Sequence, residues 1–228
     1  FDRDLESIQA LIMRMGGLVE ESIHNSVLAL DTKDAELAEK VRAGDKTIDA
    51  LEERVNEEAA RIIALRAPTA GDLRTVLSVF RVSANLERIG DYSKNIAKRS
   101  SVMFQLQPVE GASSSLKRMA RTVELMLKDA LDAYIKRDAD LAQEVRERDA
   151  EVDQIYSGLF REYLTFMMED PRNITACMHL HFMAKNIERM GDHVTSIAEQ
   201  VIYLVTGEMP DDDRIKGDST PYAQGREG

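Results

Sequence analysis

The sequence has a single cysteine, no tryptophan and few aromatic residues of any kind. Because Cys177 has no second cysteine to pair with, an intrachain disulfide is excluded, and we expect a reducing, cytoplasmic environment. Aromatic residues make up only 5 % of the 228 positions, whereas Ala and the unbranched side chains of Glu, Arg and Met are plentiful. Side chains of this kind lose little rotamer freedom in a helix, so the composition favours helices.

Long hydrophobic runs and an excess of positive charge are also missing. No apolar stretch approaches the roughly 20 residues that a membrane-spanning helix needs, so we do not expect the chain to cross a membrane. Residues 1–4 lack the charged and apolar regions of a signal peptide. The formal net charge of −11 argues against nucleic acid as a partner and favours cations.

Motifs of enzymatic catalysis are absent as well. The sequence shows no nucleophile–base pair, phosphate-binding loop or dinucleotide fingerprint. The two Glu-x-x-His motifs typical of ferritin-like di-iron sites are not present together. We expect His179 and His181 to be packing or surface residues, and His193 to point away from the acidic residue before it. These absences favour regulation over catalysis.

One heptapeptide occurs twice in the chain. Residues 85–91 read NLERIGD, and residues 186–192 read NIERMGD, so that only apolar residues are exchanged. A second phrase, at residues 34–41, returns in similar form at residues 138–145. Repetition at such a long period indicates a duplicated structural unit.

Apolar residues recur at helical spacing over nearly the whole chain, which predicts helices joined by short loops. We expect helices near residues 5–30, 34–65, 69–104, 116–136, 138–168 and 171–205. The predicted fold is all-α, with two tandem antiparallel three-helix bundles related by internal duplication; one long six-helix array is the alternative. The expected organisation is a first three-helix repeat at 1–108, a linker at 109–115, a second three-helix repeat at 116–206 and a polar, disordered tail at 207–228.

Each repeat carries two pairs of carboxylates spaced four residues apart. The pairs are Asp45/Asp49 and Glu87/Asp91 in the first repeat, and Asp149/Asp153 and Glu188/Asp192 in the second. This spacing places both carboxylates of a pair on one helix face. In a chain with 41 acidic residues, a single pair of this kind usually marks only a solvated face.

The positions of the pairs relative to the hairpin turns distinguish them from acid pairs that occur by chance on a solvated face. In each repeat the two pairs lie at similar distances before and after the turn, which falls near residue 67 or residue 170. With a rise of about 1.5 Å per residue, antiparallel partners lie within about 3 Å of the same level. Four carboxylates are therefore expected to meet on adjacent helices in each repeat. Their repulsion calls for strong solvation, for Arg88 and Arg189, or for a bound metal ion.

Two residue types repeat beside the acids. Gly90 and Gly191 each precede the last acid of the motif, although glycine inside a helix costs about 1 kcal/mol relative to alanine. Their presence indicates close approach to the backbone, either by a tightly crossing helix or by a metal site. Asn85 and Asn186 are interpreted as donors to the site or as residues of its polar rim.

The duplicated unit with its repeated acids resembles the PhoU family of phosphate-specific transport system accessory proteins. The most specific marker is Glu-Arg-apolar-Gly-Asp at residues 87–91 and 188–192, and the acid pairs at 45–49 and 149–153 fit the companion motif. The resemblance implies a cytoplasmic negative regulator of phosphate uptake and phosphate-starvation signalling. Its implied partners are the ATPase subunit of the phosphate ABC transporter, a phosphate-sensing histidine kinase and a second copy of the chain.

The resemblance also implies metal binding by the eight acids of the four pairs. The candidate ions are iron, manganese, zinc, magnesium and calcium. Because Tyr92 follows Asp91 whereas His193 follows Asp192, the two sites need not bind the same metal or bind it equally well. Two other functions are open: a metal-dependent enzyme with a multinuclear carboxylate site, and a purely structural bundle with solvated acids.

Overall fold

The computed structural model describes residues 2–211, and within this range the chain forms six α-helices, one short 3-10 helix and no strand. The elements are α1 (Asp2–Thr32), α2 (Ala35–Arg66), α3 (Ala70–Met103), α4 (Ser114–Lys136), α5 (Ala139–Glu169), η1 (Pro171–Asn173) and α6 (Ile174–Thr206). The all-α fold with two three-helix repeats is thereby confirmed. Most of the tail expected at 207–228 lies outside the described residues.

The repeated phrase at residues 34–41 and 138–145 opens the second helix of each repeat, and its first residue is the N-cap. The Asp34 carboxylate accepts a hydrogen bond of 2.9 Å from the Leu37 backbone N–H. Asp138 does the same for Leu141, at 3.0 Å. Both bonds satisfy a backbone donor that the first turn of a helix leaves unpaired. The duplication therefore preserves the start of the helix as well as its apolar face.

Two expected boundaries differ slightly from the structure. Helix α4 begins at Ser114, inside the linker expected at 109–115, a difference within the ordinary uncertainty of helix ends. The last helix was expected to start at Pro171. That proline instead opens η1, where Asp170 accepts a hydrogen bond from the Arg172 N–H, and the α-helical pattern begins at Ile174.

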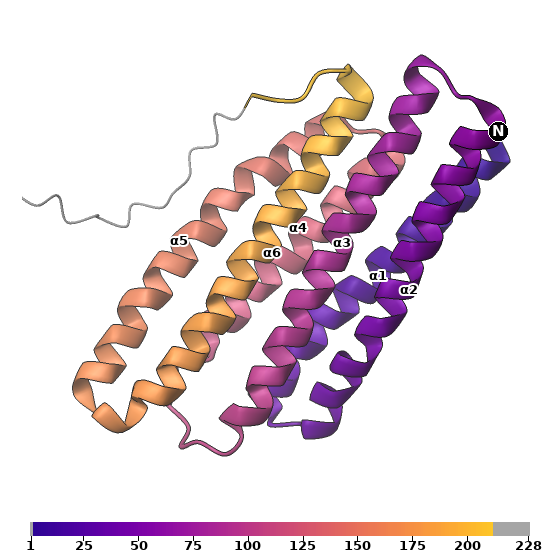
Figure 1. Ribbon diagram of the computed structural model, residues 1–228. Helices are drawn as coiled ribbons and strands as arrows, with labels where there is room; N and C mark the ends of the chain where they lie inside the picture. The colour runs from indigo at the N-terminus through magenta and orange to yellow at the C-terminus, as the bar shows by residue number, and fades with distance from the viewer. Residues whose placement is uncertain (1, 212–228) are drawn as a thin grey trace, which may run out of the picture.

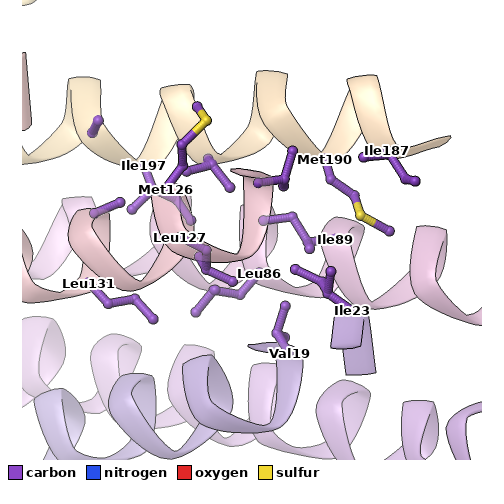
Figure 2. Packing of buried hydrophobic residues seen from close by; sticks show 14 of the residues in the cluster. Val19, Ile23, Leu86, Ile89, Met126, Leu127, Leu131, Ile187, Met190 and Ile197 are labelled. Atoms are coloured by element: carbon purple, nitrogen blue, oxygen red, sulfur yellow. The ribbon is translucent and has the colours of Figure 1, made fainter. Parts of the chain in front are cut away.

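The two bundles lie side by side and share one core. Figure 1 shows α5, α6, α3 and α2 next to one another, with α4 and α1 behind them. Helix α3 packs on α6 and α1 packs on α4, so the chain is two joined bundles rather than one extended array. Buried apolar residues from both repeats form a single continuous cluster, part of which is shown in Figure 2.

Helices α3 and α6 run antiparallel along the seam between the repeats. Near the start of α3, Arg74 lies over the Tyr203 ring, and further along the helix Asn85 contacts His193. Arg99, near the end of α3, contacts His179 near the start of α6. This seam sets the α2/α3 hairpin of one repeat beside the α5/α6 hairpin of the other (Figure 1). None of the described helices is long and apolar enough to cross a membrane.

Candidate metal centres

The first acidic cluster comprises Asp45 and Asp49 of α2 with Glu87 and Asp91 of α3. The ammonium of Lys94 joins the two helices, because it donates hydrogen bonds to Asp45 Oδ2 and, at 3.0 Å, to Asp91 Oδ1. Asp45 and Asp91 therefore face each other, as their spacing from the turn predicts. Asp45 is only 4 % exposed, so this carboxylate is held inside the protein.

The carboxylates of this cluster perturb one another. Burial, reinforced by the negative charge of Asp91, raises the pKa of Glu87 to about 7. Arg88 opposes that shift from 3.7 Å away, and it lies equally close to Asp91. Burial and the charge of Asp45 raise the pKa of Asp49. Carboxylates from both helices are thus close enough to resist joint ionisation.

Two residues of the first cluster were not predicted from the sequence. Lys94 stands among several basic residues of its helix, a pattern that usually marks a solvated face, yet it is the cation between the acids. Glu52 joins the cluster from α2, since burial and the charge of Asp49 raise its pKa. Each follows a motif acid by three residues, a spacing that places neighbours on one helix face. That spacing is the signal in the sequence for both residues, although it does not reveal that Lys94 also contacts Asp45 on α2.

The second acidic cluster comprises Asp149 and Asp153 of α5 with Glu188 and Asp192 of α6. Asp149 is buried, and its Oδ1 atom lies 3.1 Å from the position that a Cβ on Gly191 would take. Asp149 thus reaches α6 at the residue before Asp192. Glu188 lies within 2.8 Å of the Lys185 ammonium, close enough for an ion pair although not aligned as a hydrogen bond.

The repeated glycines serve tight helix crossings. A Cβ on Gly90 would lie 3.1 Å from Ile48 Cδ1 of α2, and one on Gly191 would lie 3.1 Å from Asp149 Oδ1 of α5. Both distances are shorter than ordinary van der Waals contacts. Of the two explanations offered for these glycines, the close approach of the neighbouring helix is the one that the structure bears out. At Gly191 the neighbouring atom is itself a cluster oxygen.

Asn85 and His193 lie in the α3/α6 seam. The Asn85 side-chain oxygen is 2.8 Å from His193 Nδ1, and because this oxygen only accepts, Nδ1 carries the proton. The His193 ring lies 5.8 Å from that of Tyr92 on α3. Burial lowers the pKa of His193, although Asp192 partly offsets the effect. His193 thus makes its hydrogen bond across the seam, which agrees with the expectation that it points away from Asp192.

The other histidines have ordinary contacts. His179 lies 3.4 Å from Arg99, and His181 packs against the rings of Tyr156 and Phe160. One Glu-x-x-His spacing does occur, at Glu21 and His24 on α1. There Glu21 pairs with Lys40 at 3.4 Å, and His24 lies 3.6 Å from Glu124.

The donor set of the clusters fits a hard cation. Carboxylate oxygens are the ligands that such ions prefer, and each cluster draws them from two adjacent helices. Asp45 Oδ1 is buried without a hydrogen-bond partner, so one oxygen in the first cluster retains an unused lone pair. Within residues 2–211, no three Asp, Glu, His or Cys side chains are gathered tightly enough to hold an ion as they stand. Metal binding by the eight acids stays a prediction.

Comparison with known proteins identifies the family. The profile described as PhoU domain matches this chain twice, at residues 12–100 and 116–201. The "Phosphate-specific transport system accessory protein PhoU homolog" of Rhizobium meliloti is 46 % identical over 220 residues, which cover 96 % of this chain and 93 % of that protein. The protein of the same name from Zymomonas mobilis is 47 % identical, with 95 % and 91 % covered.

Solved structures agree with this assignment. PhoU from Pseudomonas aeruginosa superposes with a TM-score of 0.88 at 38 % identity, over 91 % of this chain and 100 % of that chain. The phosphate transport system regulatory protein PhoU from Streptococcus pneumoniae gives a TM-score of 0.85 at 32 % identity, over 92 % and 99 %. The two profile matches fall on the two helical repeats, each with its own acidic cluster. The chain belongs to the PhoU family.

Proposed function

We propose that this protein is an accessory regulator of phosphate transport, which restrains phosphate uptake and phosphate-starvation signalling. The observation that carries the proposal is the pair of acidic clusters, one in each PhoU domain of a chain whose relatives are named for phosphate transport. The proposed partners are the ATPase subunit of the phosphate ABC transporter, a phosphate-sensing histidine kinase and a second copy of this chain. The proposed location is the cytoplasm.

The proposed ligands of the acidic clusters are metal ions. Asp45, Asp49, Glu87 and Asp91 would hold one site, and Asp149, Asp153, Glu188 and Asp192 the other. A bound hard cation would supply positive charge that neutralises the carboxylates and ties α2 to α3, or α5 to α6. Support comes from the raised pKa of Glu87, because burial and the charge of Asp91 make its ionised form unfavourable. The buried Oδ1 atom of Asp45 adds support, because it has no hydrogen-bond partner.

We propose a binding role rather than an enzymatic one. The clusters present acceptor oxygens without an adjacent nucleophile, and the histidine beside the second cluster makes its hydrogen bond across the seam. A metal-loaded cluster would instead order a pair of helices as a docking face. This mechanism needs only that metal binding favour one arrangement of the helices over another.

A reporter assay tests the regulatory role. In cells that lack the chromosomal copy, wild-type protein should restore repression of a phosphate-starvation promoter in phosphate-rich medium. Asp91→Asn/Asp192→Asn should fail to restore it at equal protein level, whereas Glu57→Gln, an exposed glutamate of α2 outside the clusters, should succeed. Full repression by the double variant would show that the regulatory role does not depend on the acidic clusters.

One observation favours a metal-dependent enzyme as the second candidate. A carboxyl group whose pKa is about 7 suits general acid–base catalysis near neutral pH, and Glu87 is such a group. This candidate predicts metal-dependent turnover of a phosphoester panel that Glu87→Ala abolishes. A flat profile with the metal-loaded wild type across that panel would rule it out.

A further inference from the structure

The seam between the two domains is hollowed at the end where α3 finishes and α6 begins (Figure 1). The volume of this hollow is about 390 Å³, which lies within the range of about 300–1,000 Å³ that is typical of small-molecule sites. Its lining side chains come from α3 and α6 alone and are Asn95, Lys98, Arg99, Val102, His179 and Asn186. Each PhoU domain therefore contributes one wall of the hollow.

The two cations of this hollow have no carboxylate partner. No Asp or Glu is among the lining residues, and within residues 2–211 neither Lys98 nor Arg99 forms an ion pair. The chain has 41 acidic residues, so partners for a surface cation are plentiful elsewhere. Two positive charges that share one space without a counter-ion attract an anion from solution.

Arg99 is held in place by α6. Its Cζ atom lies 4.5 Å from the centre of the Phe182 ring, and its Nη1 atom lies 3.4 Å from His179 Nδ1. Because a guanidinium only donates, Nδ1 accepts this hydrogen bond and Nε2 carries the proton of the ring. The other N–H groups of Arg99 make no hydrogen bond to residues 2–211. The two rings thus fix the guanidinium and leave it donors for a ligand.

The duplicated fold alone does not account for these cations. Since residues 85–91 correspond to residues 186–192, positions 98 and 99 correspond to Glu199 and Gln200. By the same correspondence, His179 is equivalent to Ser78. The second repeat thus carries an acid and an amide where the first repeat carries two cations. The positive charge belongs to one end of the seam and is not a feature that the repeated packing requires.

We propose that this hollow binds a small anion that carries a phosphoryl group, either free phosphate or a nucleoside phosphate. A guanidinium and an ammonium offer only donors, and a phosphoryl group offers several acceptor oxygens and close to two negative charges. The bound anion would contact α3 of one domain and α6 of the other. The site needs no metal and is separate from the acidic clusters, so the inference goes beyond the regulatory role proposed above.

NMR titration of the chelator-stripped full chain at constant pH tests the site through the imidazole signals. The protein has four histidines, and His179→Gln identifies the resonance of that residue. Inorganic phosphate and adenosine monophosphate should each shift this resonance in a saturable way, whereas acetate should not. Lys98→Glu and Arg99→Gln install the residues of the second repeat. Each should weaken binding about tenfold or more, because a charge-assisted hydrogen bond is lost.

Two controls separate this site from other sources of anion binding. Lys128→Gln removes an exposed lysine of α4 outside the hollow and should leave the affinity unchanged, although it alters the net charge as much as Lys98→Gln would. Asp91→Asn/Asp192→Asn should also bind both anions as wild type does. Loss of binding in this double variant would move the anion to the acidic clusters and overturn the inference.

The relative affinities identify the source of the phosphoryl group. Tighter binding of adenosine monophosphate than of phosphate would assign the hollow to a nucleoside phosphate, and equal or weaker binding would assign it to free phosphate. No shift with either anion at millimolar concentrations, or the same affinity in Lys98→Glu as in wild type, would overturn the inference. Acetate that binds as tightly as phosphate would overturn the phosphoryl preference. These failures would leave the regulatory role, which the reporter assay tests, unaffected.

Discussion

Lys94 of α3 donates a hydrogen bond to Asp45 of α2, a buried carboxylate 49 residues earlier in the chain. The contact fastens the two helices of the first hairpin at the level where they carry their acids. Because the same ammonium also contacts Asp91, it neutralises charge on both sides of the helix crossing. The contributions of Lys94 and Asp45 to the free energy of unfolding should therefore depend on each other.

A double-mutant cycle measures this coupling. Lys94→Met and Asp45→Asn should each lower the free energy of unfolding of the metal-free protein. Their combined effect should fall short of the sum by about 1 kcal/mol, a modest value because Lys94 is partly exposed. Urea unfolding followed by circular dichroism gives the energies. Lys98→Met, an exposed lysine further along α3, is the control, and strict additivity with Asp45→Asn would argue against the contact.

The stability of the metal-free protein should depend on Glu87 between pH 4.5 and about 7. Burial and Asp91 raise the pKa of Glu87 in the folded state, so the folded protein holds this proton more firmly than the unfolded chain does. Its contribution is complete below the ordinary value of 4.5 and is lost as pH rises through about 7. Asp49 and Glu52 act in the same direction.

Urea midpoints at several pH values from 4.5 to 8 test this dependence. Glu87→Gln should flatten the fall in stability toward neutral pH, because the amide cannot ionise. Glu57→Gln should leave the slope unchanged. An identical slope for wild type and Glu87→Gln would show that other groups set the pH dependence.

The glycines at the two crossings should respond differently to alanine. In Gly90→Ala the new Cβ meets the end of the Ile48 side chain, which can rotate away, so we expect little change in stability. In Gly191→Ala the new Cβ meets Asp149 Oδ1 and should displace this carboxylate, lowering Mn²⁺ affinity while the helices stay folded. Gly44→Ala has open space and should gain up to about 1 kcal/mol of stability.

Calorimetry and circular dichroism on the three alanine variants separate these effects. The decisive comparison is Gly191→Ala with Gly90→Ala at equal helix content. If both variants bind Mn²⁺ as wild type does, the close contact at Gly191 has no role in placing Asp149.

The helices and the level of the acid pairs could be predicted because both depend on local spacing. Helical periodicity sets the apolar faces, and distance from a hairpin turn sets which residues of two antiparallel helices meet. These two spacings predict that Asp45 lies opposite Asp91, and the shared contact with Lys94 confirms it. Duplication strengthens this prediction, because a spacing that occurs in both repeats is less often due to chance than a single pair.

Contacts between the repeats could not be predicted in the same way. The bond between Asn85 and His193 joins residues 108 positions apart, and no turn of known length fixes their register. Lys94 was missed for a related reason: among the other basic residues of α3 it resembles one of a solvated strip, and only the buried Asp45 on another helix gives it a role. Tertiary packing determines such contacts, and one sequence does not reveal it.

Metal content tests most directly whether the duplicated carboxylates hold metal ions. The purified full chain should be analysed by inductively coupled plasma mass spectrometry beside Asp91→Asn/Asp192→Asn. We expect stoichiometric metal in wild type, lost in the double variant. The opposite result is a wild type that is metal-free as isolated and stays so after reconstitution with iron, manganese, zinc, magnesium or calcium. It would contradict metal binding and leave the eight acids as solvated carboxylates.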